Sequence, residues 1–242
     1  MEQIYTIPVN EAFSAMLEEG VEHKCRCPFC EMHSRLEDKE VDRILGAAMM
    51  EPDVRIRTNQ VGFCPTHFEE MLRGKNRLGL ALILESHLDE LKGKMKGGIL
   101  GKSAAGVVKT LDALEDSCYV CERIENAFTR MIETAVLLWE RDTEFGEKFR
   151  AQTCFCLPHY RRMIAYAQAK LPKKTFARFY EEASEIENAY LEKLKEDVSW
   201  FCKKFDYRYA DEPWNGAKDA PERAIAALSS EKHVDKEIKR QV

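Results

Sequence analysis

Apolar residues recur along much of the chain at spacings of three and four, which is the period of an amphipathic helix. One stripe follows position 121 and comprises Ile124, Phe128, Met131, Ala135 and Leu138. A longer stripe comprises Phe176, Tyr180, Ala183, Tyr190, Leu194, Val198, Phe201 and Phe205. It follows Pro172, whose missing N–H costs nothing in the first turn of a helix. Helices are also predicted over residues 31–50, 65–74 and 77–92. Little of the chain alternates as a strand does, so we expect an all-α protein, an antiparallel helical bundle.

Composition supports a folded protein and argues against a nucleic-acid partner. Of the 242 residues, 45% are hydrophobic and 33% are charged, as in a globular protein with a helix-rich surface. The 37 basic and 42 acidic side chains leave a net charge of -5. No overall positive field therefore attracts nucleic acid or anionic lipid, and we expect no nucleic-acid partner.

The N-terminal residues lack the basic segment and apolar core of a secretory signal. The longest apolar run, residues 78–84, is far shorter than the roughly 20 residues that cross a bilayer. We therefore expect a cytoplasmic protein with no membrane partner. Nine cysteines in such a chain favour metal or thiol chemistry over a disulfide framework.

Glycine marks the predicted domain boundary. Five of the twelve glycines fall between residues 93 and 106, in "GKMKGGILGKSAAG". This segment predicts a linker over residues 97–106. It separates a first helical repeat (1–96) from a second (107–210), which a C-terminal extension follows (211–242).

The two predicted repeats carry the same cysteine and histidine motifs. The first half contains Cys27, Cys30, Cys64 and His67. The second half contains Cys118, Cys121, Cys156 and His159. Each half places a Cys-x-x-Cys pair before a Cys-x-x-His pair, with 33 intervening residues in the first half and 34 in the second. Flanking apolar residues also recur, which indicates an internal duplication.

These ligand types predict one metal clamp in each half. Two thiolates of a Cys-x-x-Cys turn can hold one ion, and a distant Cys-x-x-His pair completes a tetrahedron. Each pair is expected at a helix start, where the helix dipole favours thiolate over thiol. A Cys₃His set leaves no open position on zinc, so we expect two structural zinc ions per chain, each bound within one half.

Three alternatives remain open at this point. An iron–sulfur cluster uses similar soft ligands. A thiol redox site is suggested by "CPFC", although the βαβ context of such sites is missing. The eight residues can also be ordinary core positions. Cys25 and Cys154 lie outside the repeated pattern, and their roles stay open. Cys202 is expected in the core and His87 in solvent.

No catalytic set is recognisable, because the sequence lacks a Ser-His-Asp context, a His-Glu-x-x-His motif and a dinucleotide-binding glycine motif. The doubled "CPFCE…GFCPTHF" and "CYVCE…CFCLPHY" arrangement resembles an uncharacterised bacterial family, classed as a domain of unknown function, over nearly the whole chain. That resemblance implies no activity. We expect a metal-binding scaffold that acts in protein-partner binding or regulation rather than as an enzyme. The alternative is an iron–sulfur or thiol-based redox protein. The partner's identity and the oligomeric state remain open.

Overall fold

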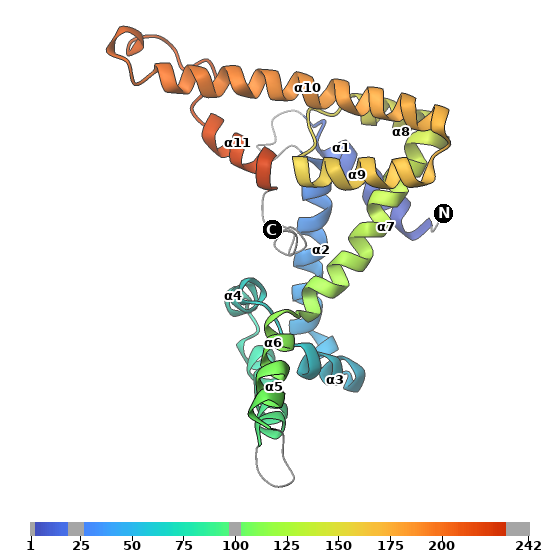
Figure 1. Ribbon diagram of the computed structural model, residues 1–242, viewed down its shortest axis with the longest axis vertical. Helices are drawn as coiled ribbons and strands as arrows, with labels where there is room; N and C mark the ends of the chain where they lie inside the picture. The colour runs from blue at the N-terminus through green and yellow to red at the C-terminus, as the bar shows by residue number, and fades with distance from the viewer. Residues whose placement is uncertain (1–2, 19–26, 97–102, 231–242) are drawn as a thin grey trace. The chain divides into compact units, whose positions relative to one another are not determined.

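The computed structural model describes residues 3–18, 27–96 and 103–230, and within these ranges the chain forms helices and no strands (Figure 1). The predicted all-α class is therefore confirmed. The α-helices are α1 (Thr6–Ala15), α2 (Pro28–Leu45), α3 (Pro52–Val61), α4 (Pro65–Arg73), α5 (Arg77–Met95), α6 (Ala104–Glu115), α7 (Tyr119–Arg141), α8 (Thr143–Arg150), α9 (Leu157–Lys170), α10 (Lys173–Lys203) and α11 (Ala220–Ser229). Three short 3-10 helices are η1 (Gln3–Tyr5), η2 (Ala47–Met50) and η3 (Tyr207–Tyr209).

Contacts within the chain divide it into two compact units. The first unit comprises Met1–Ser34 and Thr129–Val242, and the second comprises Arg35–Phe128. The divisions fall inside α2 and α7, so each of these helices contributes one end to each unit. Both units draw on residues from either side of the predicted linker. The linker itself lies partly outside the described residues, and its last residues begin α6, with the Ser103 hydroxyl accepting from the Gly106 N–H at 3.2 Å.

An aromatic core organises the first unit. Its fully buried rings are Phe13, Phe29, Phe145, Phe149, Phe155 and Phe179. Ring centroids 4.7 to 6.4 Å apart connect these rings into one cluster. Such contacts stabilise beyond the burial of apolar area alone. The long helix α10 packs along α8, α9 and α11 and covers part of this core (Figure 1).

The predicted stripe on α10 is partly wrong. Phe179 is fully buried, whereas Tyr180 and Phe205 are exposed. Two acidic residues, Glu187 and Asp197, also lie on the buried face. Partners elsewhere in the fold accompany their burial: the Phe155 N–H donates to Glu187, and the Arg223 guanidinium donates to Asp197 at 3.1 Å. The α7 stripe is confirmed: all five of its predicted residues are buried.

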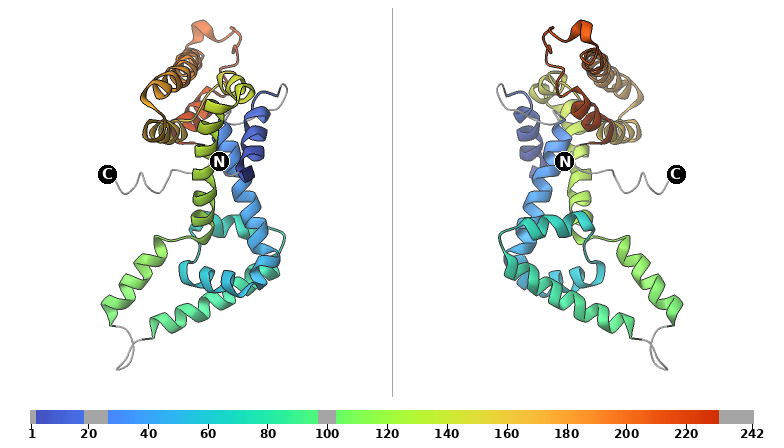
Figure 2. Two further views of the ribbon diagram at one scale, coloured as in Figure 1. Left: turned by 90° about the vertical axis from the view of Figure 1, so that its right-hand side faces the viewer. Right: turned by 90° about the vertical axis from the view of Figure 1, so that its left-hand side faces the viewer.

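The second unit forms around α5. Helices α3, α4 and α6 and the short helix η2 all contact α5. Figure 2 shows α5 and α6 as two arms that converge where α5 ends and α6 begins. None of the residues of α6 is buried. The buried apolar residues of this unit lie on other helices, among them Ile44 on α2, Ile83 on α5 and Ile124 on α7.

Two residues, His87 and Cys202, differ in burial from what the sequence predicted. His87 is buried on α5, because its ring packs against the backbone of Gly62. Gly62 adopts a φ of 61°, which non-glycine residues rarely adopt, and a Cβ there would lie 3.2 Å from the His87 ring. Cys202, predicted in the core, is exposed near the end of α10. No helix in the described part of the chain combines the length and apolar character needed to span a membrane.

Candidate metal centres

All four repeated pairs lie at helix N-termini. The first cysteine of each pair immediately precedes a helix, and its carbonyl accepts from the N–H four residues on, at 2.9 to 3.3 Å. These cysteines are Cys27 before α2, Cys64 before α4, Cys118 before α7 and Cys156 before α9. The second member of each pair follows three residues later, in the first turn. The predicted placement at helix starts is confirmed, and both side chains of a pair project from the positive end of a helix dipole.

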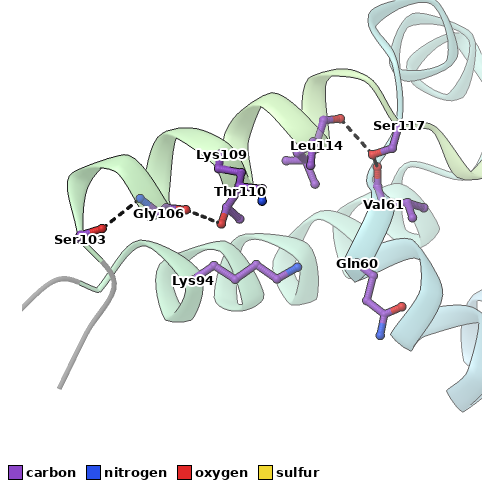
Figure 3. A pocket seen from close by; sticks show the side chains of 10 residues that line it. Gln60, Val61, Lys94, Ser103, Gly106, Lys109, Thr110, Leu114 and Ser117 are labelled. Carbon is purple, nitrogen blue, oxygen red and sulfur yellow. Dashed lines mark hydrogen bonds between the residues drawn. The ribbon is translucent and has the colours of Figure 1, made fainter.

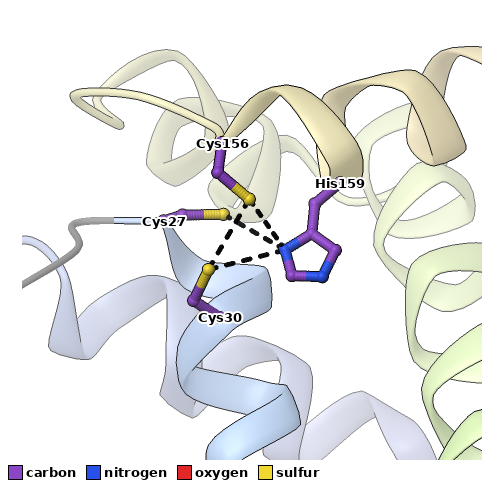
Figure 4. Close-up of side chains that lie close together, drawn as sticks. All are labelled: Cys27, Cys30, Cys156 and His159. Atoms are coloured by element: carbon purple, nitrogen blue, oxygen red, sulfur yellow. Dashed lines mark hydrogen bonds between the residues drawn. The ribbon is translucent and has the colours of Figure 1, made fainter. Parts of the chain in front are cut away.

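One group of four ligands, which we name cluster A, consists of Cys27, Cys30, Cys156 and His159. The starts of α2 and α9 bring it together within the first unit (Figure 4). The Nδ1 atom of His159 lies 3.8, 3.6 and 3.1 Å from the sulfurs of Cys27, Cys30 and Cys156, respectively. The Cys30 and Cys156 sulfurs are 3.6 Å apart. All four residues are buried.

The other group, cluster B, consists of Cys64, His67, Cys118 and Cys121. It lies within the second unit, at the starts of α4 and α7. The Nδ1 atom of His67 lies 3.2, 3.3 and 3.4 Å from the sulfurs of Cys64, Cys118 and Cys121, respectively. The Cys64 and Cys121 sulfurs are 3.9 Å apart. Cys121 is half-buried, and the other three ligands are buried.

The structure thus brings together all eight predicted residues, but it pairs them across the two halves. The prediction that each half supplies its own Cys₃His set is wrong. The first Cys-x-x-Cys pair meets the last Cys-x-x-His pair, and the two inner pairs meet each other. Because the two Cys-x-x-Cys pairs are chemically equivalent, spacing along the chain cannot show which partner each one meets. The packing of α2, α4, α7 and α9 decides it.

Both clusters have dimensions that suit one tetrahedral ion. A zinc–sulfur distance of about 2.3 Å and a zinc–nitrogen distance of about 2.0 Å place two sulfurs about 3.8 Å apart and a sulfur and a nitrogen about 3.5 Å apart. The observed separations of 3.6 and 3.9 Å between sulfurs, and of 3.1 to 3.8 Å between sulfur and nitrogen, bracket these values. In each cluster all four ligand atoms lie within 4.8 Å of one another. Each cluster can therefore hold a metal ion.

The clustered thiols shift one another's pKa values. Hydrogen bonds with Cys118 and Cys121 lower the pKa of Cys64, whereas Cys118 and Cys64 raise the pKa of Cys121. In cluster A, Cys27 raises the pKa of Cys156. Sulfurs this close cannot all be thiolates unless a positive charge offsets their repulsion. A metal ion supplies that charge, and binding would release the remaining protons.

The neighbouring sulfurs also shift the pKa of His67. Burial disfavours a charged imidazole at His67, but hydrogen bonds with Cys118, Cys64 and Glu37 outweigh it and raise the pKa to about 11. The raised pKa means that the neighbouring sulfurs and Glu37 favour a proton on the ring. A divalent ion can replace that proton at Nδ1.

Rings shield cluster A from water. Phe29 lies between the two cysteines of its motif in sequence, and Phe155 directly precedes Cys156. The rings of Phe29 and Phe155 are 5.7 Å apart, and the rings of Phe29 and His159 are 6.1 Å apart. The aromatic core therefore extends to the ligands, which lowers the local dielectric constant and strengthens bonds between thiolates and a cation.

Sequence reasoning missed two buried carboxylates beside the clusters. Glu37 on α2 is fully buried and lies 3.2 Å from His67 Nε2. Glu187 on α10 accepts from the backbone N–H of Phe155 at 3.1 Å. A signal was present in both cases: Glu37 shares a helical stripe with Val41 and Ile44, and Glu187 follows the buried Ala183 by four positions. An acidic residue on an apolar stripe predicts a buried polar partner.

The remaining sequence candidates lie outside both clusters. Cys154 is buried but belongs to neither four-ligand group. Cys25 lies outside the described residues. The role of each stays open.

A cavity of about 620 Å³ opens in the second unit between α5, α6 and the end of α3 (Figure 3). Lys94 and Lys109 lie on facing helices, while Val61 and Leu114 contribute apolar surface. Among the residues that the structure describes, those lining the cavity carry amine, amide, hydroxyl and apolar groups. The described lining thus offers two lysine amines and the hydroxyls of Ser103, Thr110 and Ser117, with no carboxylate or imidazole among them.

The chain belongs to a family of unknown function, DUF6062, which it matches over residues 1–235. The resemblance stated from the repeated motifs is thereby confirmed. No curated protein and no solved structure matches the chain. Membership in this family assigns no activity, so the functional argument rests on the two clusters.

Proposed function

We propose that this member of the DUF6062 family binds two zinc ions, one in each cluster, and that these ions act as structural cross-links. The observation that carries the proposal is the presence of two buried Cys₃His sets, each with ligand spacing that fits a single tetrahedral ion. All eight predicted residues would serve as ligands. Four protein ligands fill the coordination of zinc and leave no position for a substrate, which is typical of structural sites.

The cross-link would act on helix ends. In each unit the ion would tie the starts of two helices that are distant in sequence, so its binding energy would become folding energy. Cys30 and Cys156 are 126 positions apart, and Cys64 and Cys121 are 57 positions apart. We infer that the resulting helical framework serves as a scaffold for a protein partner or for regulation. Reduced thiolates are required throughout, which favours a reducing compartment such as the cytoplasm.

Ligand spacing favours a single ion over an iron–sulfur cluster. A cluster distributes its protein ligands over more than one iron, which separates them more widely than a single ion does. One observation nevertheless supports the redox alternative: Cys121 is half-buried and is accessible to an oxidant. Oxidation of such a thiolate would release the metal.

Metal analysis tests the proposal directly. Protein purified in parallel with and without oxygen should contain about two zinc ions per chain and show no visible absorption band. Iron together with sulfide, and a brown colour in the anaerobic sample, would place the protein in the redox class. Absence of metal from both preparations would refute the central claim.

Chelation separates a structural from a catalytic role. Removal of a structural ion should lower the helix content measured by circular dichroism, and re-addition of zinc should restore it. Retention of full helix content and unchanged thermal stability after complete zinc removal would exclude the cross-linking role.

A further inference from the structure

Cluster B differs from an isolated ligand set because a buried carboxylate holds the second nitrogen of its histidine. Glu37 lies in the middle of α2, and one of its carboxylate oxygens is 3.2 Å from Nε2 of His67. Both side chains are almost wholly inaccessible, with exposed fractions of 0% for Glu37 and 1% for His67. The opposite ring nitrogen, Nδ1, faces the three sulfurs at 3.2 to 3.4 Å. The imidazole therefore joins the ligand set to a buried acid.

Burial of the Glu37 carboxylate is destabilising unless a hydrogen-bond donor pairs with it. An ionised carboxylate that is removed from water loses its solvation, and a hydrogen-bond donor is needed to offset that loss. His67 Nε2 lies 3.2 Å from the Glu37 carboxylate, and a proton on this nitrogen would make it a donor to Glu37. A neutral imidazole carries one N–H, and if Nε2 carries it, Nδ1 retains the lone pair that a metal needs. The carboxylate thus favours the one tautomer that can bind a metal from the cluster side.

We propose that Glu37 is a positioning residue for the metal site in cluster B: it accepts the Nε2–H of His67, fixes the ring and makes Nδ1 the ligand atom. This inference rests on the proposed function, because it requires a metal ion at cluster B. Carboxylates that hold a ligating histidine in this way orient the ring and raise its basicity, and their loss typically weakens metal binding about 10- to 100-fold.

The placement of Glu37 also connects helices of the second unit to the site. The ligands of cluster B come from the starts of α4 and α7, whereas Glu37 comes from α2. A third helix therefore participates in holding the imidazole. The neighbouring Glu70 on α4 lies in the same group as Glu37 and His67, which places a second acidic side chain close to the ring.

Two substitutions and one control test the role. Glu37→Gln keeps the size of the side chain but weakens the acceptor, and Glu37→Met fills the volume without any acceptor. Glu187→Gln alters the buried carboxylate of the other unit and is the matched control. Zinc-loaded proteins are titrated with a chelator, and the alkylation of each cysteine is followed by mass spectrometry. This readout separates the cysteines of cluster B from those of cluster A.

We expect both Glu37 variants to release zinc from cluster B at chelator concentrations about 10- to 100-fold lower than the wild type. Cys64, Cys118 and Cys121 should become reactive while the cysteines of cluster A stay protected. Glu187→Gln should leave the release from cluster B unchanged. Wild-type zinc affinity of cluster B in both Glu37 variants would overturn the proposal.

A measurement on the wild type keeps the test independent of folding in the variants. Long-range proton–nitrogen NMR of the zinc-loaded protein should show His67 with a proton on Nε2 and the metal on Nδ1. A proton on Nδ1, or zinc bound to Nε2, would refute the positioning role. Failure of the wild type to hold zinc at cluster B at all would instead refute the proposed function, so the two failures are distinguishable.

Discussion

The cross-pairing of the motifs can be tested by removing one ligand and observing which other ligands lose protection. In Cys156→Ser, cluster A keeps Cys27, Cys30 and His159 but lacks its fourth ligand. Because Cys156 contacts Cys30 and His159, we expect Cys27 and Cys30 to become exposed to reagents. Cys118 and Cys121 belong to cluster B and should remain protected. A pairing within each half predicts the opposite result.

The expected loss of stability follows from the length of the chain segment that the metal ion would close into a loop. Cys30 and Cys156 are separated by 126 positions. The entropy of closing a loop of that length is worth about 5 kcal/mol, if a metal cross-link constrains the unfolded chain as a disulfide does. The shorter separation of 57 positions in cluster B gives about 4 kcal/mol. Cys156→Ser should therefore reduce the zinc content from about two ions toward one and lower the free energy of unfolding of the first unit by several kcal/mol.

The assay combines zinc analysis with alkylation of cysteines under native conditions, followed by mass spectrometry. Cys202→Ser is the matched control, because Cys202 is exposed and belongs to neither cluster. It should retain the wild-type zinc content and the wild-type protection of all ligands. Increased reactivity of Cys118 and Cys121 in Cys156→Ser, with Cys27 and Cys30 still protected, would refute the cross-paired arrangement.

Three further predictions concern the surroundings of the clusters. Burial raises the pKa of Glu187 from 4.5 to about 7, so its contribution to stability is present below pH 4.5 and is lost as the pH rises through 7. Relative to wild type, Glu187→Gln should gain up to about 3 kcal/mol between pH 4.5 and 8 in denaturant titrations, and a pH-independent difference would refute this. Phe149→Ala, at a fully buried ring, should cost about 3–5 kcal/mol in the same assay, and a cost below 1 kcal/mol would contradict the packing. Gly62→Ala, at a φ of 61° and against His87, should lower the thermal midpoint and destabilise by roughly 1–3 kcal/mol, whereas an unchanged midpoint would exclude strain there.

The sequence was sufficient to predict the fold class and the members of the candidate site, for reasons that particular residues illustrate. The stripe from Ile124 to Leu138 recurs at helical spacing, and every member is buried. Cys-x-x-Cys and Cys-x-x-His are local motifs, so their identity and their placement at helix starts depend on a few adjacent residues. Each of these features depends on residues that lie within about one or two helical turns of one another.

The features that sequence reasoning missed depend on tertiary structure. Which Cys-x-x-Cys pair meets which Cys-x-x-His pair is decided by helix packing, since spacing and ligand type are the same in both pairs. Glu37 and Glu187 were not recognised because an acidic residue is ordinarily exposed, and their partners, among them His67 and the Phe155 N–H, are distant in sequence. His87 was assigned to solvent for the same reason, although its ring packs against Gly62.

The cross-pairing also changes how the repeated motifs are interpreted. Each half of the sequence contains four ligands that would suffice for one tetrahedral site, yet in the structure those four belong to two different clusters in two different units. Cys27 and Cys30 start α2 in the first unit, while Cys64 and His67 start α4 in the second. A half of the chain taken alone would therefore hold one pair from each cluster and complete neither. The two halves therefore do not each assemble a ligand set, because each unit takes one Cys-x-x-Cys pair and one Cys-x-x-His pair from different halves of the chain.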